Sequence, residues 1–127
     1  MRYKFSEITP EISRLAEMSL EGYRIDPELY TQYDVKRGLR DINGNGVVAG
    51  LTNISTIKVL ETGDGMPNHG DGKLYYRGID VEDIVAGFIK EKRFGFEETV
   101  YLLLFGKMPS EHELAEFRKL LADFREL

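Results

Sequence analysis

Residues 74–89, LYYRGIDVEDIVAGFI, decide the fold, because the spacing of their apolar residues changes part-way along. The aromatic start is typical of a strand. After Gly78, the side chain of Asp80 can cap a helix, and the acidic residues that follow favour a first helical turn. The apolar residues of this helix share one face: Val81, Ile84, Val85, Phe88 and Ile89. The stretch therefore predicts a strand-to-helix junction.

The chain is predicted to remain helical after this junction. Residues 96–105 form a second helix, which Gly106 closes and Pro109 stops. A capping box over residues 110–113 opens a third helix. Its apolar stripe consists of Leu114, Phe117, Leu120, Leu121 and Phe124. This last helix is predicted to run to Leu127 with its stripe still continuing, which fits either a natural terminal helix or a chain whose packing partners lie elsewhere.

Two shorter helices are predicted upstream. Thr9 followed by Pro10 combines a capping oxygen with a residue that needs no amide donor, and it predicts a helix over about 10–22. Asp26 followed by Pro27 repeats the signal for a brief helix over about 27–34. We treat residues 1–36 as leader helices.

The middle of the chain has no helical period. Nine of its thirteen glycines lie between Gly38 and Gly78. Residues 47–48 and 54–59 are rich in β-branched side chains and, with 74–76, indicate strands. The stretch between them, 62–72, has the composition of turns. The predicted fold class is therefore mainly α, with amphipathic helices and a small antiparallel sheet or hairpin at about 47–76.

Composition excludes several classes of function. The 127 residues fit at most one domain, and the net charge of −5 argues against nucleic acid or an anionic membrane as a partner. The absence of cysteine removes disulfides, thiolate zinc sites and cysteine nucleophiles. No signal peptide and no membrane-spanning stretch is visible. We expect a cytoplasmic chain.

Residues 40–46, RDINGNG, start like a calcium-binding loop. From Asp41, the position that normally supplies a bidentate glutamate falls on Thr52, which cannot replace it. Helices should flank such a loop, but Val47 begins a predicted strand. The pattern therefore favours a tight turn over a metal site.

Other metal ligands are sparse. The loop 62–72 contains Asp64, His69 and Asp71, which could hold a metal but are also ordinary residues of a solvated turn. His112 lies in the first turn of the last predicted helix and is expected to be exposed. Two histidines without cysteine do not make a familiar zinc set. No metal site is predicted.

Nucleophilic catalysis finds no support in the residues either. Ser55 and Thr56 lie in a predicted strand without a nearby histidine. The nucleophile elbow, the dinucleotide fingerprint and the phosphate loop are absent. Residues 75–77, YYR, could stack on a base, but in an acidic chain a strand end is the simpler interpretation. The residues alone define no active site.

Several unusual sequence motifs nevertheless occur in a fixed order. They are GLR at 38–40, GVVAG at 46–50, KLYYRGIDVED at 73–83 and FEETVYLLLFGKMP at 96–109. As a set they resemble the N-terminal part of citrate synthases. The resemblance covers about 37–127, whereas residues 1–36 are similar only loosely to the variable leader helices of that family.

The resemblance implies a fold and an activity. Residues 37–127 would form the N-terminal portion of a truncated, largely helical large domain. The parent enzyme would condense acetyl-CoA with oxaloacetate to give citrate and CoA. Its catalytic aspartate, histidines and arginines belong to family motifs that this chain lacks, so no catalytic residue is assigned and the chain alone should be inactive. The implied partners are the remainder of the enzyme and a second copy, and no cofactor beyond the CoA substrate is implied.

One binding residue follows from the resemblance. In some relatives an arginine in the corresponding G-x-R segment reaches the CoA phosphate, and Arg40 occupies the similar place here. The following Asp41 and the insertion DINGN depart from the family pattern and can redirect the loop. Arg77, at the strand-to-helix junction, is expected to fix the turn and the next helix rather than to take part in catalysis.

Two other interpretations remain open. The first is a 2-methylcitrate synthase, which takes propionyl-CoA and is similar over the same region. The second is a stand-alone, non-catalytic module that pairs with citrate synthase subunits or regulates them. Because the last helices carry apolar stripes, we also expect the isolated chain to self-associate.

Overall fold

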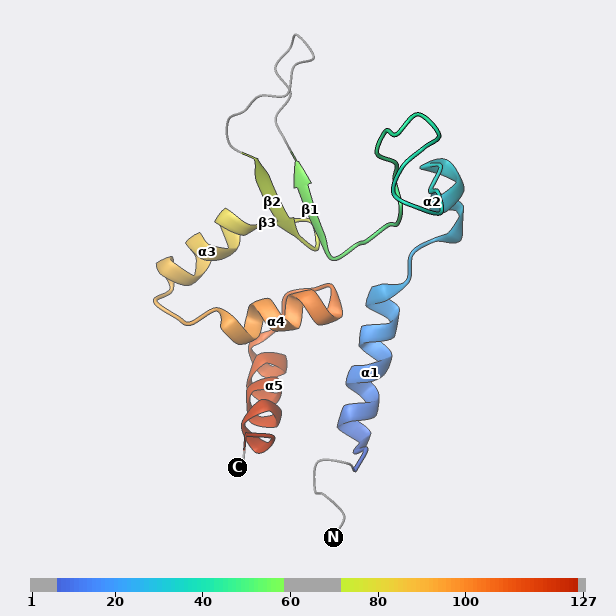
Figure 1. The fold of residues 1–127 in the computed structure, drawn as a ribbon. Coiled ribbons are helices and arrows are strands. Elements are labelled where there is room, and N and C mark those ends of the chain that lie inside the picture. Colours follow the sequence, from blue (N-terminus) through green and yellow to red (C-terminus); the bar gives the residue numbers. More distant parts are fainter. Residues whose placement is uncertain (1–6, 59–71, 126–127) are drawn as a thin grey trace.

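The computed structural model describes residues 7–58 and 72–125, which form five helices and three strands (Figure 1). Their order is α1 (Pro10–Tyr23), α2 (Pro27–Gln32), β1 (Ser55–Lys58), β2 (Lys73–Tyr76), β3 (Ile79–Asp80), α3 (Val81–Lys90), α4 (Phe96–Phe105) and α5 (Glu111–Asp123). The prediction of a mainly helical chain with a small antiparallel sheet in its middle is confirmed.

The predicted caps begin the helices. The Thr9 hydroxyl accepts a hydrogen bond from the Ile12 amide at 3.2 Å, and Pro10 follows it at the start of α1. Asp26 does the same for α2, where its carboxylate accepts from the Glu28 amide at 3.0 Å. At α5 both bonds of the Ser110 capping box are present. Local side-chain chemistry thus fixes where these helices start.

The three strands form one antiparallel sheet in the order β1-β2-β3. The first pair runs from Ser55 opposite Tyr76 to Lys58 opposite Lys73. β2 turns directly into β3 through Arg77 and Gly78, whose φ angles are 49° and 84°. Two central residues of positive φ are typical of a type I′ hairpin turn. At two residues, β3 is too short for its alternation to be visible in the sequence.

The predicted strand at Val47–Val48 is wrong. The structure has no strand there, because the chain turns back on itself at this point. An isolated bridge joins Arg40 to Gly46, and the Lys36 amide donates to the Val48 carbonyl at 2.9 Å. These bonds direct the backbone toward its own preceding segment, so the sheet starts at Ser55 and extends to Asp80 rather than spanning 47–76.

Two helix ends also differ from the prediction. α2 stops at Gln32 rather than near residue 34, because Asp34 adopts a left-handed φ of 49°. α5 ends at Asp123 rather than at Leu127: the Arg125 amide bonds to the Ala122 carbonyl at 3.0 Å, which tightens the chain out of the α-helical pattern. Residues 126–127, like the predicted loop candidates Asp64, His69 and Asp71, lie outside the described residues.

The core is small and lies where α4 crosses its neighbours. Figure 1 shows α4 running between α3, α5 and the end of α1. Tyr101 and Leu102 of α4 are fully buried, and Phe117 of α5 stands edge-on to Tyr101 with ring centroids 5.4 Å apart. Phe105 completes this aromatic cluster, 4.5 Å from Tyr101. Edge-to-face aromatic pairs stabilise the core beyond the contribution of the buried area.

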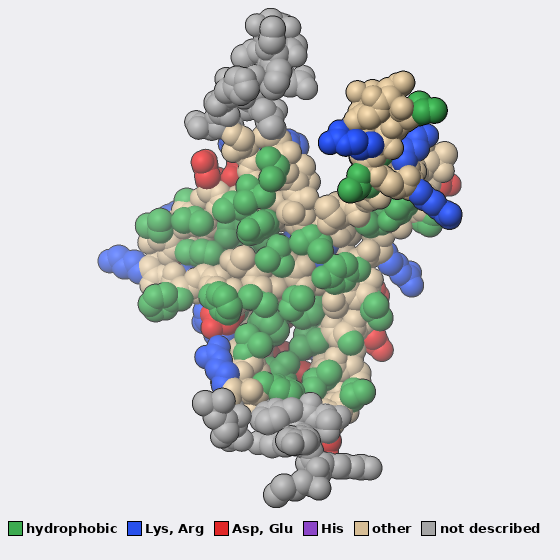
Figure 2. Space-filling view, viewed as in Figure 1, with side chains coloured by type: hydrophobic (Ala, Val, Ile, Leu, Met, Phe, Trp, Pro, Cys, Tyr) green, Lys and Arg blue, Asp and Glu red, His purple; other side chains and the backbone are tan. Residues whose placement is uncertain are grey.

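Much of the apolar surface stays outside that core. In the described part of the chain, four hydrophobic side chains are buried: Ile84, Tyr101, Leu102 and Phe117. Ile42 and Phe94 are 99% and 88% exposed, and Figure 2 shows apolar side chains spread over the face that carries the sheet, α3 and α4. Within residues 7–58 and 72–125, no helix is long and apolar enough to cross a membrane.

Candidate functional site

The 40–46 segment is a turn held by the Asp41 carboxylate. Its Oδ1 accepts hydrogen bonds from the Asn43 and Asn45 amides, both at 2.8 Å, and its Oδ2 accepts from the Asn45 side chain at 3.1 Å. Gly44 supplies a φ of 83°. These bonds, led by the one from the Asn45 amide, lower the pKa of Asp41 below its ordinary value. The tight-turn interpretation is confirmed, and both carboxylate oxygens already accept hydrogen bonds within the turn.

Arg40, the candidate for the CoA phosphate, lies at the base of this turn. Its Nη1 donates to the Gly44 carbonyl at 2.8 Å, which holds the side chain along the turn. The residue is exposed, and Ile42 at the tip is almost fully exposed. An exposed guanidinium with further donors is a group of the kind that binds phosphate. Phosphate binding by Arg40 stays a prediction.

The other chemical candidates do not meet in the described structure. Ser55 and Thr56 lie on β1, which is exposed along its length. The side chain of His112 is 81% exposed, and its Nδ1 lies 3.6 Å from Glu116, one turn further along α5. Within residues 7–58 and 72–125, no three histidine or acidic residues are grouped as a metal site would require.

Arg77 joins four parts of the chain. Its Nε and Nη2 donate to the Leu103 carbonyl of α4 at 3.1 and 2.7 Å. Its Nη1 donates to the Gly22 carbonyl in α1 at 2.8 Å and to the Asn53 Oδ1 at 2.7 Å. The guanidinium also lies over the Tyr23 ring, 5.4 Å from its centroid. Arg77 therefore has a structural role, as predicted, but its bonds go to α1, Asn53 and α4 rather than to the next helix, α3.

Asn53 is a residue that the sequence did not reveal. Its Nδ2 donates to the Gly22 carbonyl at 2.8 Å while its Oδ1 accepts from Arg77. Both ends of the amide are used, and one side chain thereby links the approach to β1 with the end of α1. An asparagine in a loop is too common to indicate this role. The useful signal was Arg77, whose five donors require several acceptors when it is partly buried.

A second charged cluster fixes the start of α4. The Glu98 side chain is buried in its first helical turn and forms an ion pair with Arg93. Arg93 also pairs with Glu91 at 2.7 Å and lies over the Phe88 ring, 4.8 Å from its centroid. The hydrogen bond to Glu98, followed by that to Glu91, raises the pKa of Arg93. This cluster orients the α3–α4 connection, since a buried carboxylate requires its partner.

Tyr101 and Glu113 connect α4 with α5. Burial, followed by the nearby Glu113 charge, raises the pKa of the Tyr101 hydroxyl. Lys107 lies 2.6 Å from Glu113, and the Ser110 amide donates to the same carboxylate at 2.8 Å. Together these bonds lower the pKa of Glu113 to about 2. The network performs a structural task at a helix start.

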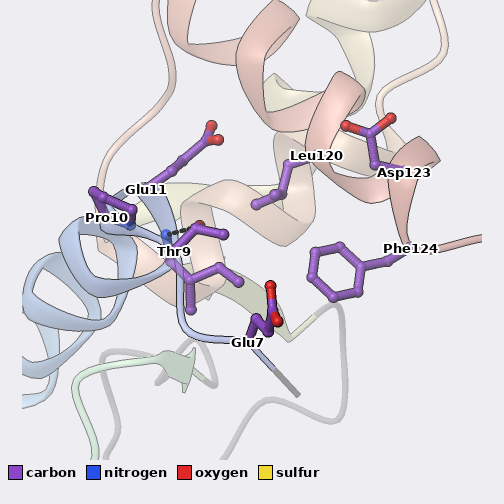
Figure 3. Close-up of a pocket in the computed structure, with 8 residues that line it drawn as sticks. Glu7, Thr9, Pro10, Glu11, Leu120, Asp123 and Phe124 are labelled. Atoms are coloured by element: carbon purple, nitrogen blue, oxygen red, sulfur yellow. Dashed lines mark hydrogen bonds between the residues drawn. The ribbon is translucent and has the colours of Figure 1, made fainter. Parts of the chain in front are cut away.

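A hollow lies between the start of α1 and the end of α5. Its volume is about 530 Å³. Figure 3 shows Leu120 and Phe124 on the α5 side of this groove. Glu7, Glu11 and Asp123 contribute carboxylates to its lining, and among the residues of 7–58 and 72–125 neither a lysine nor an arginine lines it. An acidic lining repels the phosphates of CoA, so this groove does not fit that substrate.

Comparison with protein families identifies the chain. The model described as "Citrate synthase, C-terminal domain" matches residues 39–127. The chain belongs to the citrate synthase family. The matched range contains the strand-to-helix junction, α4 and α5, the segments on which the resemblance was based. The description of the model names a C-terminal domain, whereas the sequence placed residues 37–127 in the N-terminal portion of the large domain; that placement stays a prediction.

The curated relatives include enzymes of two names. The chain is 35% identical to 2-methylcitrate synthase 2 of Corynebacterium glutamicum over 97 residues, 76% of this chain and 20% of the relative. It is 42% identical to citrate synthase of Saccharolobus solfataricus over 48 residues, 37% and 11% of the two chains. A citrate synthase-related protein of Dictyostelium discoideum is 38% identical over 55 residues, 43% and 12%. The chain thus spans a fifth or less of the length of these relatives. No solved structure is significantly similar to it.

Proposed function

We propose that this chain is a structural portion of a citrate synthase family acyltransferase, whose parent enzyme condenses acetyl-CoA with oxaloacetate to give citrate and CoA. The family assignment supports the reaction class. The small share of each relative that the chain covers supports a portion rather than a whole enzyme. The portion would carry the frame of the large domain, while the catalytic groups would come from the remainder of the enzyme.

The accessible surface carries this proposal. The chain exposes 10515 Å². A compact monomer of 14.6 kDa would expose roughly 6,900 Å². Obligate interfaces bury roughly 2,000–5,000 Å² or more summed over both partners, so an excess of this size on one chain corresponds to a very large interface. Together with the small core, this excess supports a chain that is completed by further protein, from the rest of the enzyme or from a second copy.

Activity measured in two halves tests the proposal. The chain would be mixed with C. glutamicum 2-methylcitrate synthase 2 lacking its matching segment, and CoA release would be followed with acetyl-CoA and oxaloacetate. We expect neither half alone to exceed a blank without protein, and the mixture to release CoA. Citrate formation by the 127-residue chain alone would contradict the proposal.

A second candidate, 2-methylcitrate synthase, is favoured by one observation. The matches to 2-methylcitrate synthases extend over 82 to 97 residues, whereas the match to the S. solfataricus citrate synthase extends over 48. Propionyl-CoA in the same complementation assay separates the two candidates. A higher kcat/KM for propionyl-CoA than for acetyl-CoA would support this second candidate. A stand-alone partner module would instead bind a complete enzyme, and its mixture with the truncated enzyme would release no CoA from either acyl-CoA.

Arg40 is the binding residue of the proposal. In the complemented enzyme, Arg40→Ala should raise the KM for the acyl-CoA about tenfold, the loss of one charge-assisted contact, and leave the KM for oxaloacetate unchanged. Arg37→Ala, a neighbouring exposed cation, is the control. Equal KM values in wild type and Arg40→Ala would end this assignment without affecting the reaction class. The cysteine-free composition is compatible with action in the cytoplasm.

A further inference from the structure

The turn at 40–46 contains two asparagines, and each is followed by glycine. They are Asn43 before Gly44 and Asn45 before Gly46, and all of these residues are exposed. A glycine leaves the backbone nitrogen after an asparagine open to approach, because it carries no side chain. A Cβ at either glycine would meet no atom of the described residues within 4 Å beyond its chain neighbours. The two pairs are therefore sterically alike and differ in their hydrogen bonds.

Hydrogen bonds to Asp41 hold Asn45 at three groups. Its amide donates to Oδ1 at 2.8 Å, its Nδ2 donates to Oδ2 at 3.1 Å, and its carbonyl accepts from the Asp41 amide at 2.9 Å. The bond to the carbonyl restrains the ψ angle of Asn45, and the bond to Nδ2 restrains its side chain. The Asn45 Cγ therefore has little freedom to move toward the Gly46 nitrogen.

Asn43 is held at its amide, which donates to the Asp41 Oδ1 at 2.8 Å. Within residues 7–58 and 72–125, no hydrogen bond reaches its side chain or its carbonyl. The Gly44 amide donates to the Asp41 carbonyl at 3.1 Å, and this bond has to open before the nitrogen can react. An exposed turn opens locally at a small cost in free energy. The Asn43 side chain can then rotate toward the Gly44 nitrogen without breaking a bond of its own.

We propose that Asn43 is a site of spontaneous deamidation in the folded chain. The Gly44 nitrogen gives its proton to hydroxide and attacks the Asn43 Cγ. The new N–Cγ bond forms, the Cγ–Nδ2 bond breaks, and Nδ2 takes up a proton from water and leaves as ammonia. Water then opens the resulting cyclic succinimide at either carbonyl, which gives aspartate or isoaspartate. Water and hydroxide are the only co-reactants of these steps.

The modification changes the turn that holds Arg40. Either product adds a carboxylate to a turn that already contains the carboxylate of Asp41. Isoaspartate also adds a methylene to the backbone before Gly44, whose carbonyl accepts from Arg40 at 2.8 Å. Both changes oppose the hydrogen bonds that now close the turn. The inference concerns the chemistry of the chain itself and does not rest on the acyltransferase reaction.

Peptide mapping by mass spectrometry tests the proposal. The folded 127-residue chain would be aged at mildly alkaline pH and digested with trypsin, beside an unaged sample that corrects for reaction during digestion. Cleavage after Arg40 and Lys58 releases residues 41–58, which contain both asparagine–glycine pairs. Fragmentation locates the mass gained when an amide becomes an acid. Asn43 should react roughly tenfold faster than Asn45, because Asn45 has two further hydrogen bonds to lose.

Equal rates at the two positions of the folded chain, or a faster Asn45, would overturn the proposal. So would a folded chain in which Asn43 does not react at all. Ageing in guanidinium chloride separates structure from sequence. There the bonds to Asp41 are lost, and the two asparagines should react at similar rates. A preference for Asn43 that persists unchanged in the denaturant would come from sequence alone and would overturn the structural argument.

A matched pair of variants tests the role of the Asp41 carboxylate. Asp41→Ala removes the acceptor for the Asn45 amide and side chain, so the Asn45 rate should approach that of Asn43. Glu17→Ala removes an exposed carboxylate from α1 and should leave the difference in rate between the two asparagines unchanged. A ratio of rates that Asp41→Ala does not alter, or that both variants alter equally, would contradict the protection of Asn45 by Asp41.

Discussion

The two described parts of the molecule are held in different ways. The buried residues of the described chain all lie in 72–125: Ile84, Glu98, Tyr101, Leu102 and Phe117. Residues 7–58 contain none, and α1 and α2 are each without a buried residue. The second part has a core, whereas the first is attached to it by surface packing and by side-chain hydrogen bonds. The difference teaches that an apolar sequence can form helices without completing a core.

Arg77 and Asn53 form the main hydrogen-bonded connection between the two parts. Each of them bonds to the Gly22 carbonyl at 2.8 Å, and Arg77 bonds to Leu103 of α4 as well. The glycine at position 22 lets α1 pack closely on the end of α4, because a Cβ at this position would lie 3.3 Å from the Phe105 carbonyl oxygen. The leader helix is therefore bound to the second part by the C-terminal end of α1, near the C-terminus of α4, and by an ion pair between Arg14 and Glu116 of α5 at 3.7 Å.

The largest expected effect is in the core of the second part. Phe117→Ala should lower the free energy of unfolding by about 4 kcal/mol, because it leaves a cavity beside Tyr101 and Phe105. Urea denaturation followed by circular dichroism measures the loss. Ile42→Ala, at a 99% exposed position of the first part, is the matched control and should change the stability by less than about 0.5 kcal/mol. Similar losses at both positions would remove the distinction between the two parts.

The next effect concerns the hydrogen bonds that Arg77 forms between the two parts. Arg77→Ala should cost about 3 kcal/mol, because the Leu103 and Gly22 carbonyls and the Asn53 side chain lose a charged donor. Hydrogen exchange should show α1 losing protection before α4 and α5 do. Arg77→Lys keeps the charge but not the forked geometry, and it should recover less than half of the loss. Simultaneous loss of protection in α1, α4 and α5 would show that the two parts unfold as one.

Glycines of positive φ allow a smaller comparison. Gly106, with φ of 77°, closes α4, and Gly44, with φ of 83°, lies in the exposed turn. Gly106→Ala should cost about 1 kcal/mol, because alanine disfavours left-handed backbone at a helix end that the core requires. Gly44→Ala should alter the urea transition by less than about 0.5 kcal/mol if the turn can open locally. A larger loss at Gly44 than at Gly106 would contradict the assignment of the core.

The smallest effect is one of pH. Glu113 ionises at a pKa of about 2 rather than its ordinary 4.5, because Lys107 and Ser110 bond to the carboxylate. The resulting stabilisation is complete above the ordinary value and disappears as the pH falls from about 5 toward 2. After allowance for solvent screening it should amount to about 1 kcal/mol or less. Melting temperatures over this range should fall more steeply for wild type than for Glu113→Gln; parallel curves would exclude the contribution.

Local chemistry made most elements predictable. Thr9, Asp26 and Ser110 cap the helices whose starts they predicted, and Gly106 closes α4. The errors arose where tertiary bonds decide: Val47 and Val48 have the composition of a strand, yet the bridge between Arg40 and Gly46 turns their segment away from the sheet. β3 was missed because the Arg77–Gly78 turn, rather than a repeated pattern, creates it.

The candidate site was less predictable than the fold. Arg77 was assigned a structural role from its place beside Gly78, and its bonds confirm that role. Asn53 was missed, because the use of both ends of its amide depends on α1, some thirty residues away in the chain. The groove was missed for the same reason, since its two sides come from the first and last described helices.

Association of the chain with the rest of a family member tests the central claim most directly. Isothermal titration calorimetry at several temperatures would mix this chain with C. glutamicum 2-methylcitrate synthase 2 lacking its matching segment. If the exposed apolar surface is an interface, the two should bind one to one with a large negative heat capacity change, the mark of apolar burial. A chain that stays folded and monomeric at high concentration and gives no heat of binding would contradict the account.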